Sequence, residues 1–391
     1  MNTYIRNPFQ FEGVVTGSNF CDREDDIAEL LEYMYSSNNV IISMKRRVGK
    51  SSIIKEIFSN HIKEQRVLTA YVDIYGITST KELYVVLKEG IEQIATASFS
   101  IGIVIDRLRN AFSEAILQVE VGESNKLSIN FHGSNYPELI KKLLLSIEKY
   151  AQENDIRIVL AIDEFQKIAS LKTKDSLNIQ TNIRSAMQTC KHISFIISGS
   201  NQTMLDNMFQ ESEPLFRQGG HHYLEPIDKD IFHRWVENKF RLKEITFSKE
   251  AFYYLYELAN SEAKIIQQVC FKLFGKFDEL QIIQKSDVCD TLIKLYRSNS
   301  EIMSKFNNLK LTEQKMMKII ALEKETGITV SPLLNEYDIN SGSVNGILTQ
   351  LLKNYQITKL NTGNYEIVDT ELKLWILVDK NILCLPLVIH N

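Results

Sequence analysis

The sequence predicts an α/β fold in which a parallel sheet is covered by helices on both faces. Short apolar runs alternate with stretches of helical periodicity in the first part of the chain. The runs are apolar at successive positions, which is typical of strands buried on both faces of a parallel sheet. We expect strands at residues 40–43, 67–74, 156–162, 193–198 and 223–226.

The stretches between these strands have the spacing of amphipathic helices. Before the first strand, four apolar residues recur at positions i, i+3, i+4 and i+7: Ile27, Leu30, Leu31 and Met34. Residues 51–62 predict a helix directly after the first strand, and residues 136–150 predict another. Residues 95–135 follow the alternation less well, and we expect an additional helix and an irregular segment there.

After Pro226 the pattern becomes helical, and it predicts two further domains. A final block has the order helix, helix, helix, hairpin, which is that of a winged helix. Its expected helices and strands are 312–323, 332–337, 342–353, 355–360 and 365–368. We therefore expect an α/β domain at 1–226, a helical lid at 227–305 and a winged-helix domain at 306–391.

The composition limits the classes of protein that this chain can belong to. Its 391 residues favour two or three domains. The net charge of −4 provides no overall basic field for nucleic acid. No apolar run is long enough to span a bilayer, the N-terminus has no apolar signal segment, and the five cysteines form no CxxC pair. We expect a cytoplasmic protein without a membrane partner.

A basic segment joins the first strand to the next helix: Met44-Lys45-Arg46-Arg47-Val48-Gly49-Lys50-Ser51. In a P-loop, backbone N–H groups surround the β-phosphate, a lysine contacts the β- and γ-phosphates, and a hydroxyl binds Mg²⁺. Gly49, Lys50 and Ser51 supply these groups at a helix N-terminus. Met44 replaces the usual first glycine, and a basic turn without a ligand is the alternative. The residues expected to contact nucleotide here are Arg46, Arg47, Val48, Gly49, Lys50, Ser51 and Ser52.

A pair of acidic residues follows the apolar run at 156–162. In such a pair, Asp163 holds Mg²⁺ together with Ser51, since Mg²⁺ takes oxygen ligands and keeps several waters. Glu164 acts as the general base that orients the attacking water. The alternative is that the pair only caps the next helix.

Four further residues are candidates for contact with the phosphates. Ser200 and Asn201 follow the strand at 193–198, where a polar side chain can reach the γ-phosphate. Arg217 can reach the γ-phosphate of a neighbouring copy of the chain and stabilise transition-state charge. Lys264 begins a helix of the expected lid. The alternatives are a Gly-Ser turn and a surface arginine.

Taken together, these motifs resemble those of the archaeal-type AAA+/STAND P-loop ATPases. The P-loop resembles their G/S-P-R-R-V-G-K-T/S, and Asp163-Glu164-Phe165-Gln166 resembles their Walker B motif. Ser198-Gly199-Ser200 and Pro214-Leu215-Phe216-Arg217 resemble their sensor and arginine segments. Phe20-Cys21-Asp22-Arg23-Glu24 resembles their segment near the adenine, so the resemblance implies that Arg23 contacts the nucleotide. The STAND lid motif Gly-x-Pro falls on Ser261-Glu262-Ala263, which has neither residue.

The resemblance implies the ASCE sheet order, a helical lid, ATP and Mg²⁺ as cofactors, and switching driven by hydrolysis with self-assembly. We therefore expect an ATP-hydrolysing molecular switch. One alternative is a nucleotide-gated binding module with little turnover, which Met44 motivates. The other is a DNA-acting ATPase, such as a loader or a mobile-element accessory, which the winged helix motivates.

The expected winged helix has a weak electrostatic footprint for DNA. Residues 311–380 contain seven lysines, no arginine and nine acidic residues, for a net charge of −2. The expected partners are therefore ATP or ADP, further copies of the chain, and either a protein or DNA at this domain.

Overall fold

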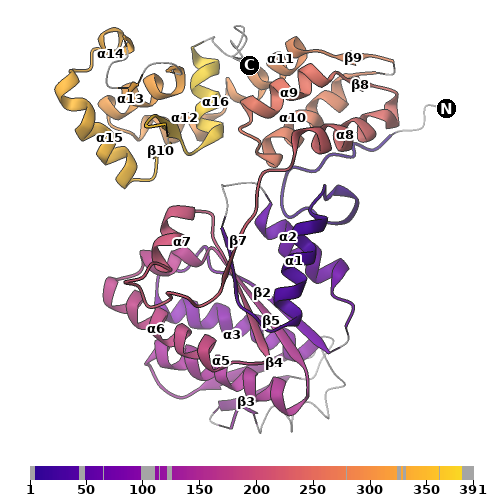
Figure 1. Ribbon diagram of the computed structural model, residues 1–391, viewed down its shortest axis with the longest axis vertical. Coiled ribbons are helices and arrows are strands. Elements are labelled where there is room, and N and C mark those ends of the chain that lie inside the picture. The colour runs from indigo at the N-terminus through magenta and orange to yellow at the C-terminus, as the bar shows by residue number, and fades with distance from the viewer. Residues whose placement is uncertain are drawn as a thin grey trace. The chain divides into compact units, whose positions relative to one another are not determined.

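The computed structural model of the protein describes residues 5–43, 49–64, 66–97, 111–113, 115–120, 126–278, 280–323, 327–328, 332–360 and 362–380. The chain forms two compact units, which are Glu12–Ile227 and the combination of Met1–Phe11 with Asp228–Asn391. Figure 1 labels their elements. The first eleven residues thus belong with the later unit, and the three domains predicted from the sequence stay a prediction.

The first unit is built on a five-stranded parallel sheet in the order β2-β5-β6-β1-β7. β1 and β2 follow each other along the chain, but β5 and β6 lie between them in the sheet. The prediction of a parallel sheet with the P-loop NTPase strand order is confirmed. The strands are β1 (Val40–Ser43), β2 (Val67–Asp73), β5 (Arg157–Asp163), β6 (Ile193–Ser198) and β7 (Gly220–Tyr223).

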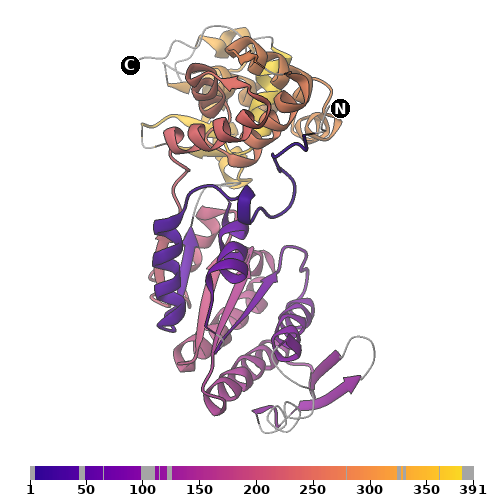
Figure 2. The same cartoon turned by 90° about the vertical axis from the view of Figure 1, so that its right-hand side faces the viewer.

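Helices cover both faces of this sheet, as Figure 2 shows. One face is covered by α1 (Glu24–Tyr35) and by α2 (Lys50–Glu56), which continues as a π-helix over Ile57–His61. The other face is covered by α3 (Thr80–Ala97), α5 (Tyr136–Glu153) and α6 (Thr173–Thr189).

The inner strands carry runs of successive apolar residues because alternate residues enter different cores. In β5, Ile158, Leu160 and Ile162 belong to the cluster under α3, α5 and α6. Val159 and Ala161 belong to the cluster under α1 and α2. All five residues are buried. The continuous apolar run is therefore the direct consequence of a strand with a core on each side.

The last strand differs from the prediction. The sequence predicted 223–226, whereas β7 is Gly220–Tyr223 and pairs in parallel with β1. Its residues Gly-His-His-Tyr form no apolar run, because β7 lies at the end of the sheet order and, among the described strands, pairs with β1 alone. A polar edge strand carries no signal of the kind that identified the other four strands.

The segment 95–135 also differs from the prediction of an irregular segment. It contains an antiparallel hairpin of β3 (Ala115–Glu120) and β4 (Lys126–Phe131). In β4 the apolar residues Leu127, Ile129 and Phe131 alternate with polar ones, and Ile129 is fully buried against the α3 side of the sheet. This period of two was the missed signal. The sequence also predicted an additional helix in this segment. Helix α3 extends to Ala97, and residues 98–110 lie outside the described part, so this helix stays a prediction.

The second unit begins with a helical bundle. Its phenylalanines form a continuous aromatic core in which Phe240 contacts Phe9, Phe247 and Phe274. A short parallel pair joins β8 (Thr246–Phe247) to β9 (Ile282–Ile283). The helices are α8 (Lys229–Phe240), α9 (Lys249–Leu258), α10 (Ala263–Lys276), α11 (Lys285–Tyr296) and α12 (Ser300–Asn307).

The last part of this unit has three helices followed by a hairpin and a further helix. Its assignment as a winged helix stays a prediction. The final helix, α16 (Thr370–Asp379), is apolar on nearly all sides, and its Trp375 packs on Phe306 of α12. The preceding elements are α13 (Leu311–Leu322), α14 (Leu333–Glu336), α15 (Val344–Lys353), β10 (Ile357–Lys359) and β11 (Tyr365–Ile367). Among the described helices of both units, none combines the length and apolar character that a membrane span requires.

Candidate active site

Polar side chains meet at the edge of the sheet where neighbouring parallel strands end. β1, β5 and β6 end in Ser43, Asp163 and Ser198. The register pairs Ile162 with Ile197, so that Asp163 and Ser198 follow side by side. In open α/β sheets, ligands bind outside the carboxyl ends of the strands. This edge is therefore where a ligand site is expected on topological grounds alone.

Asp163 is the centre of the hydrogen bonds at this edge. Its Oδ2 accepts hydrogen bonds from the Ser51 hydroxyl (2.6 Å) and the Tyr71 hydroxyl (2.5 Å). Its Oδ1 accepts them from the Ser198 hydroxyl (2.7 Å) and the backbone N–H of Glu164 (2.9 Å). The side chains come from α2, β2 and β6, so one carboxylate joins three elements to β5.

Asp163 is ionised despite being only 2% exposed. Burial is the largest influence on the pKa of Asp163 and raises it. The positive charge of Lys50 and the hydroxyl donors outweigh burial, so the pKa of Asp163 lies below its ordinary value. The site thus holds a desolvated negative charge that favours a cation.

The helix that follows the P-loop segment begins as predicted. Gly49 has a φ of 108°, a left-handed conformation that favours glycine, and it precedes α2. Lys50 is buried at the first position of the helix. Ser52 accepts a hydrogen bond from the N–H of Val15 (3.1 Å), so its hydroxyl is engaged with the N-terminal segment. The predicted contacts of Arg46, Arg47 and Val48, like Met44, lie outside the described residues.

Glu164 takes part in a closed triangle of hydrogen bonds. Its Oε2 accepts from the Ser200 hydroxyl (2.8 Å) and from Nε2 of Gln166 (2.7 Å). Nε2 of Gln166 also lies 3.3 Å from Oγ of Ser200. The predicted base and the predicted sensor are therefore in direct contact. Asn201 instead caps α7 (Gln202–Met208) by accepting the N–H of Met204 (3.1 Å).

Sequence reasoning assigned no role to two residues of this site. Gln166 stands in the Walker-B-like motif, two residues after Glu164, and its polar type was the available signal. Tyr71 reaches Asp163 from the neighbouring strand β2, which only the pairing of β2 with β5 could have shown. Burial first, and then the negative charge of Asp163, raise the pKa of Tyr71, so its hydroxyl stays protonated as a donor.

Arg217 and Lys264 do not belong to this group of contacts. Arg217 is exposed, has a φ of 56°, and its guanidinium lies over the ring of Phe216 (4.9 Å). Lys264 lies on α10 of the second unit, with its Nζ 3.8 Å from Glu371. Their predicted contacts with phosphate stay predictions.

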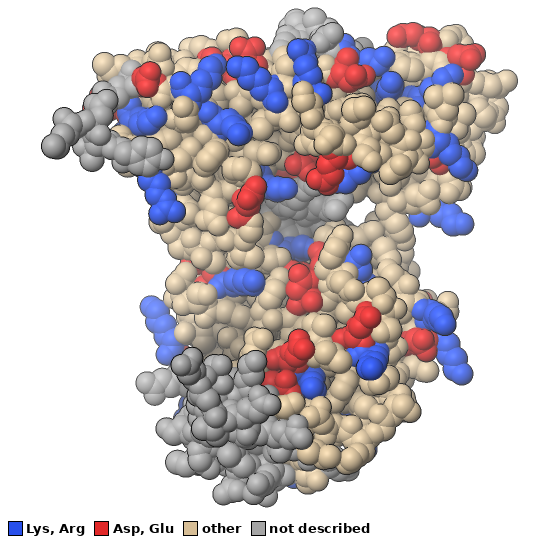
Figure 3. Space-filling view, turned by 180° about the vertical axis from the view of Figure 1, so that it is seen from behind, with Lys and Arg blue, Asp and Glu red and all other residues tan. Residues whose placement is uncertain are grey.

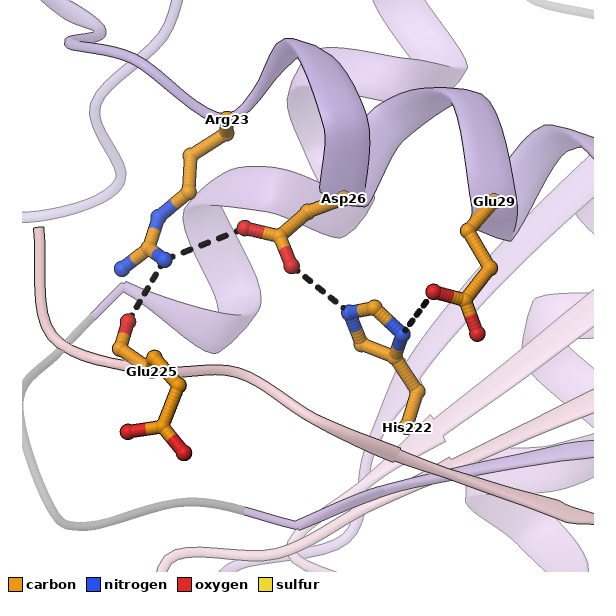
Figure 4. Close-up of polar contacts among 5 residues, drawn as sticks. All are labelled: Arg23, Asp26, Glu29, His222 and Glu225. Carbon is orange, nitrogen blue, oxygen red and sulfur yellow. Dashed lines mark hydrogen bonds and ion pairs between the residues drawn. The ribbon is translucent and has the colours of Figure 1, made fainter.

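Arg23 is buried, and it belongs to a polar cluster at the start of α1 (Figure 4). Its Nη1 donates to Asp26 (3.1 Å) and to the carbonyl of Glu225 (2.6 Å). Nε2 of His222 lies 2.9 Å from the other oxygen of Asp26, and Nδ1 lies 3.2 Å from Glu29. Arg23 therefore ties α1 to the segment that leaves β7, and its predicted nucleotide contact stays a prediction.

The sheet order, the helix after Gly49 and the ionised Asp163 define the fold class as that of a P-loop NTPase. A family model for an ATPase domain found predominantly in Archaea matches residues 20–269. The chain belongs to this archaeal family of AAA+ P-loop ATPases, and it is an ATPase that binds ATP.

Solved structures agree in fold. A Walker-type ATPase of Pyrococcus abyssi is 15% identical, with a TM-score of 0.60 over 94% of this chain and 99% of that chain. The ORC2 protein of Aeropyrum pernix, solved in ADPNP and ADP complexes, is 13% identical, with a TM-score of 0.53 over 92% of this chain and 93% of that chain. The sequence matches no curated protein.

Proposed function

We propose that the protein is an AAA+/STAND-type molecular switch whose Mg²⁺-dependent ATP hydrolysis takes place where β1, β5 and β6 end. The observation that carries the proposal is the hydrogen bond from Ser51 at the start of α2 to Asp163 at the end of β5. A hydroxyl after the P-loop lysine and a Walker B aspartate are the two protein groups that hold Mg²⁺ in P-loop NTPases.

The residues present fit a magnesium ion that binds together with the nucleotide. The Ser51 hydroxyl donates a hydrogen bond to Asp163, which leaves the lone pairs of its Oγ for a cation. In the described parts of the chain, no group of three or more His, Cys, Asp or Glu could hold a metal. Nucleotide-bound Mg²⁺ does not require such a group, because phosphate and water complete its ligands. When bound, Mg²⁺ neutralises charge that develops on the phosphates.

The protein's own groups divide the remaining roles. Lys50 would contact the β- and γ-phosphates, and Glu164 would orient the attacking water and accept its proton. Ser200, with Asn201 beside it, would sense the γ-phosphate. Arg217 would act on the site of a neighbouring copy, which its exposure supports.

For the C-terminal helices and hairpin we propose contact with a protein rather than with DNA. The exposed residues of α15 are Asn345, Gly346, Thr349, Gln350 and Lys353, so that the helix offers a single charge. Phosphate contacts require Lys or Arg. On the face drawn in Figure 3, basic and acidic residues are interspersed over the described surface, without a broad region of one sign.

The test is ATP turnover by the full chain and by Glu164→Gln, with Mg²⁺ or with a chelator, and with or without DNA. We expect Mg²⁺-dependent turnover that Glu164→Gln lowers by a factor of about 100 or more while ATP still binds. Unchanged turnover in Glu164→Gln would contradict the role of Glu164. Stimulation by DNA, combined with salt-dependent binding, would replace the protein partner with DNA.

A further inference from the structure

Among the described residues, the carboxylate of Glu164 accepts side-chain hydrogen bonds at one of its two oxygens. Oε2 accepts the hydrogen bonds from Gln166 (2.7 Å) and Ser200 (2.8 Å). Among the described residues, none donates a hydrogen bond to Oε1. This arrangement suits a general base, because one oxygen is fixed by hydrogen bonds while the other can receive the proton of the water.

The backbone after β5 turns Gln166 back onto Glu164. Glu164 has a φ of 60° and a ψ of 32°, a left-handed conformation that non-glycine residues rarely adopt. The 3₁₀-helix Phe165–Ser170 starts immediately afterwards, and the N–H of Lys167 donates to the carbonyl of Glu164 (2.9 Å). Phe165 is fully buried and fixes the start of this turn. Backbone strain of this kind is found at functional sites.

The turn after β6 leaves space for the same amide. Gln166 is only 4% exposed. A Cβ added to Gly199 would lie 2.2 Å from Oε1 of Gln166, so any side chain at position 199 would displace the amide. The next residue, Ser200, completes the triangle with Glu164. The turns after two neighbouring strands thus fit together around one glutamine.

We propose that Gln166 is a positioning residue for Glu164. Together with Ser200 it fixes the carboxylate so that Oε1 faces the attacking water. This inference rests on the proposed role of Glu164 as the base. In this proposal Gln166 acts through Glu164, and it makes no contact of its own with the water or the phosphate. The Ser200 hydroxyl contacts both the Glu164 carboxylate and the Gln166 amide. If this hydroxyl instead donates its hydrogen bond to a phosphate oxygen, Gln166 remains as the side-chain donor to Glu164.

A positioning role predicts a specific kinetic defect. Without its amide donor, the carboxylate samples other rotamers, and misplacement of a catalytic group by about 1 Å can cost a factor of 100 in rate. Binding of ATP does not use this carboxylate, so kcat falls and KM does not. A purely structural role would instead lower stability without separating kcat from KM.

The experiment compares Gln166→Met with Gln180→Met, both in the full chain. Gln180 is a matched control on α6, because it is 3% exposed and donates to Oγ of Ser176 (3.0 Å). Its Oε1, like that of Gln166, accepts no hydrogen bond from the residues that the structure describes. We expect kcat to fall by a factor of about 10 to 100 in Gln166→Met, with KM within about twofold of the wild type. Gln180→Met should keep the wild-type kcat.

Two further variants keep the inference falsifiable. Gln166→Leu also removes the donor, with an apolar side chain of a different shape, so it should show the same loss of kcat even if Gln166→Met folds poorly. Combining Gln166→Met with Glu164→Gln should be no slower than Glu164→Gln alone, because residues that act as a unit are not additive.

The outcomes separate this inference from the proposed function. If Glu164→Gln is inactive and both glutamine variants at 166 match Gln180→Met in kcat, Gln166 does not position the base and the proposed function stands. If Glu164→Gln keeps wild-type turnover, the role of Glu164 is wrong and the inference is overturned with it.

Discussion

At the scale of single residues, the hydrogen bonds to Asp163 hold its carboxylate in place without a bound cation. Four donors surround a carboxylate that is almost fully desolvated. Removing a carboxylate from water is costly unless its oxygens are paired. The donors therefore keep Asp163 charged and fix its orientation before nucleotide arrives. The contact between Tyr71 and Oδ2 was not predicted from the sequence, and a single substitution can remove it.

We predict that Tyr71→Phe weakens the apparent affinity for Mg²⁺ during turnover by a factor of about 10, because partners that orient a metal ligand contribute 10- to 100-fold to metal affinity. The other three donors remain, so the protein should fold and bind ATP. The measurement is the Mg²⁺ concentration that gives half-maximal turnover. Tyr84→Phe is the control, since it removes a hydroxyl from α3 that does not contact Asp163. An equal Mg²⁺ requirement in the two variants would exclude this role for Tyr71.

At the scale of elements, β7 is held to the sheet by side chains as well as by its ladder with β1. His222 projects from β7 between Asp26 and Glu29 of α1 (Figure 4). The hydrogen bond to Asp26 raises the pKa of His222, burial opposes the rise, and Glu29 adds to it, so the pKa of His222 lies above its ordinary value of 6.5. The protonated ring can donate to both carboxylates.

We predict that this contact stabilises the protein more at low pH than at high pH. A pKa raised in the folded state means a contribution that is complete below the unfolded pKa of His222 and is lost as pH rises through the folded pKa. Burial raises the pKa of Asp26, but His222 and Arg23 outweigh it, so this pKa is lowered and the contribution of Asp26 is lost only as pH falls below its ordinary value of 3.8. His222→Gln should thus lower the free energy of unfolding more at about pH 6 than at about pH 9. A pH-independent difference between the two proteins would contradict the ion pair.

The elements also show how far the sequence could predict the fold and the site. β1, β2, β5 and β6 were predictable because each carries an apolar run, and Asp163 and Glu164 because they follow such a run. β7 was misplaced because its attachment depends on α1, nearly 200 residues away in the chain. Tyr71 and Gln166 were missed as site residues because a strand register and a left-handed turn bring them to the site. Contacts of this kind have no local pattern.

At the scale of the whole molecule, Arg217 is a predicted site residue that lies outside the hydrogen bonds at the sheet edge. Arg217 is exposed in a left-handed turn just before β7, and it contacts only the neighbouring Phe216 ring among the interactions that we find in the described residues. An exposed arginine can stabilise transition-state charge at the site of an adjacent copy. Such head-to-tail contacts give rings or filaments, in which each copy offers one site and one arginine.

We predict that Arg217→Ala and Glu164→Gln are each nearly inactive and that mixing them restores turnover. An Arg217→Ala copy keeps an intact base, and a Glu164→Gln neighbour supplies the arginine. With random assembly at equal amounts, about a quarter of the interfaces combine both, so about a quarter of the wild-type turnover should return. Arg184→Ala is a suitable control, because Arg184 is engaged within the chain by the carbonyl of Pro214 (2.6 Å), and its mixture with Glu164→Gln should show no gain beyond simple addition. If the two inactive variants do not complement each other and wild-type turnover per copy is constant with protein concentration, Arg217 does not act between copies.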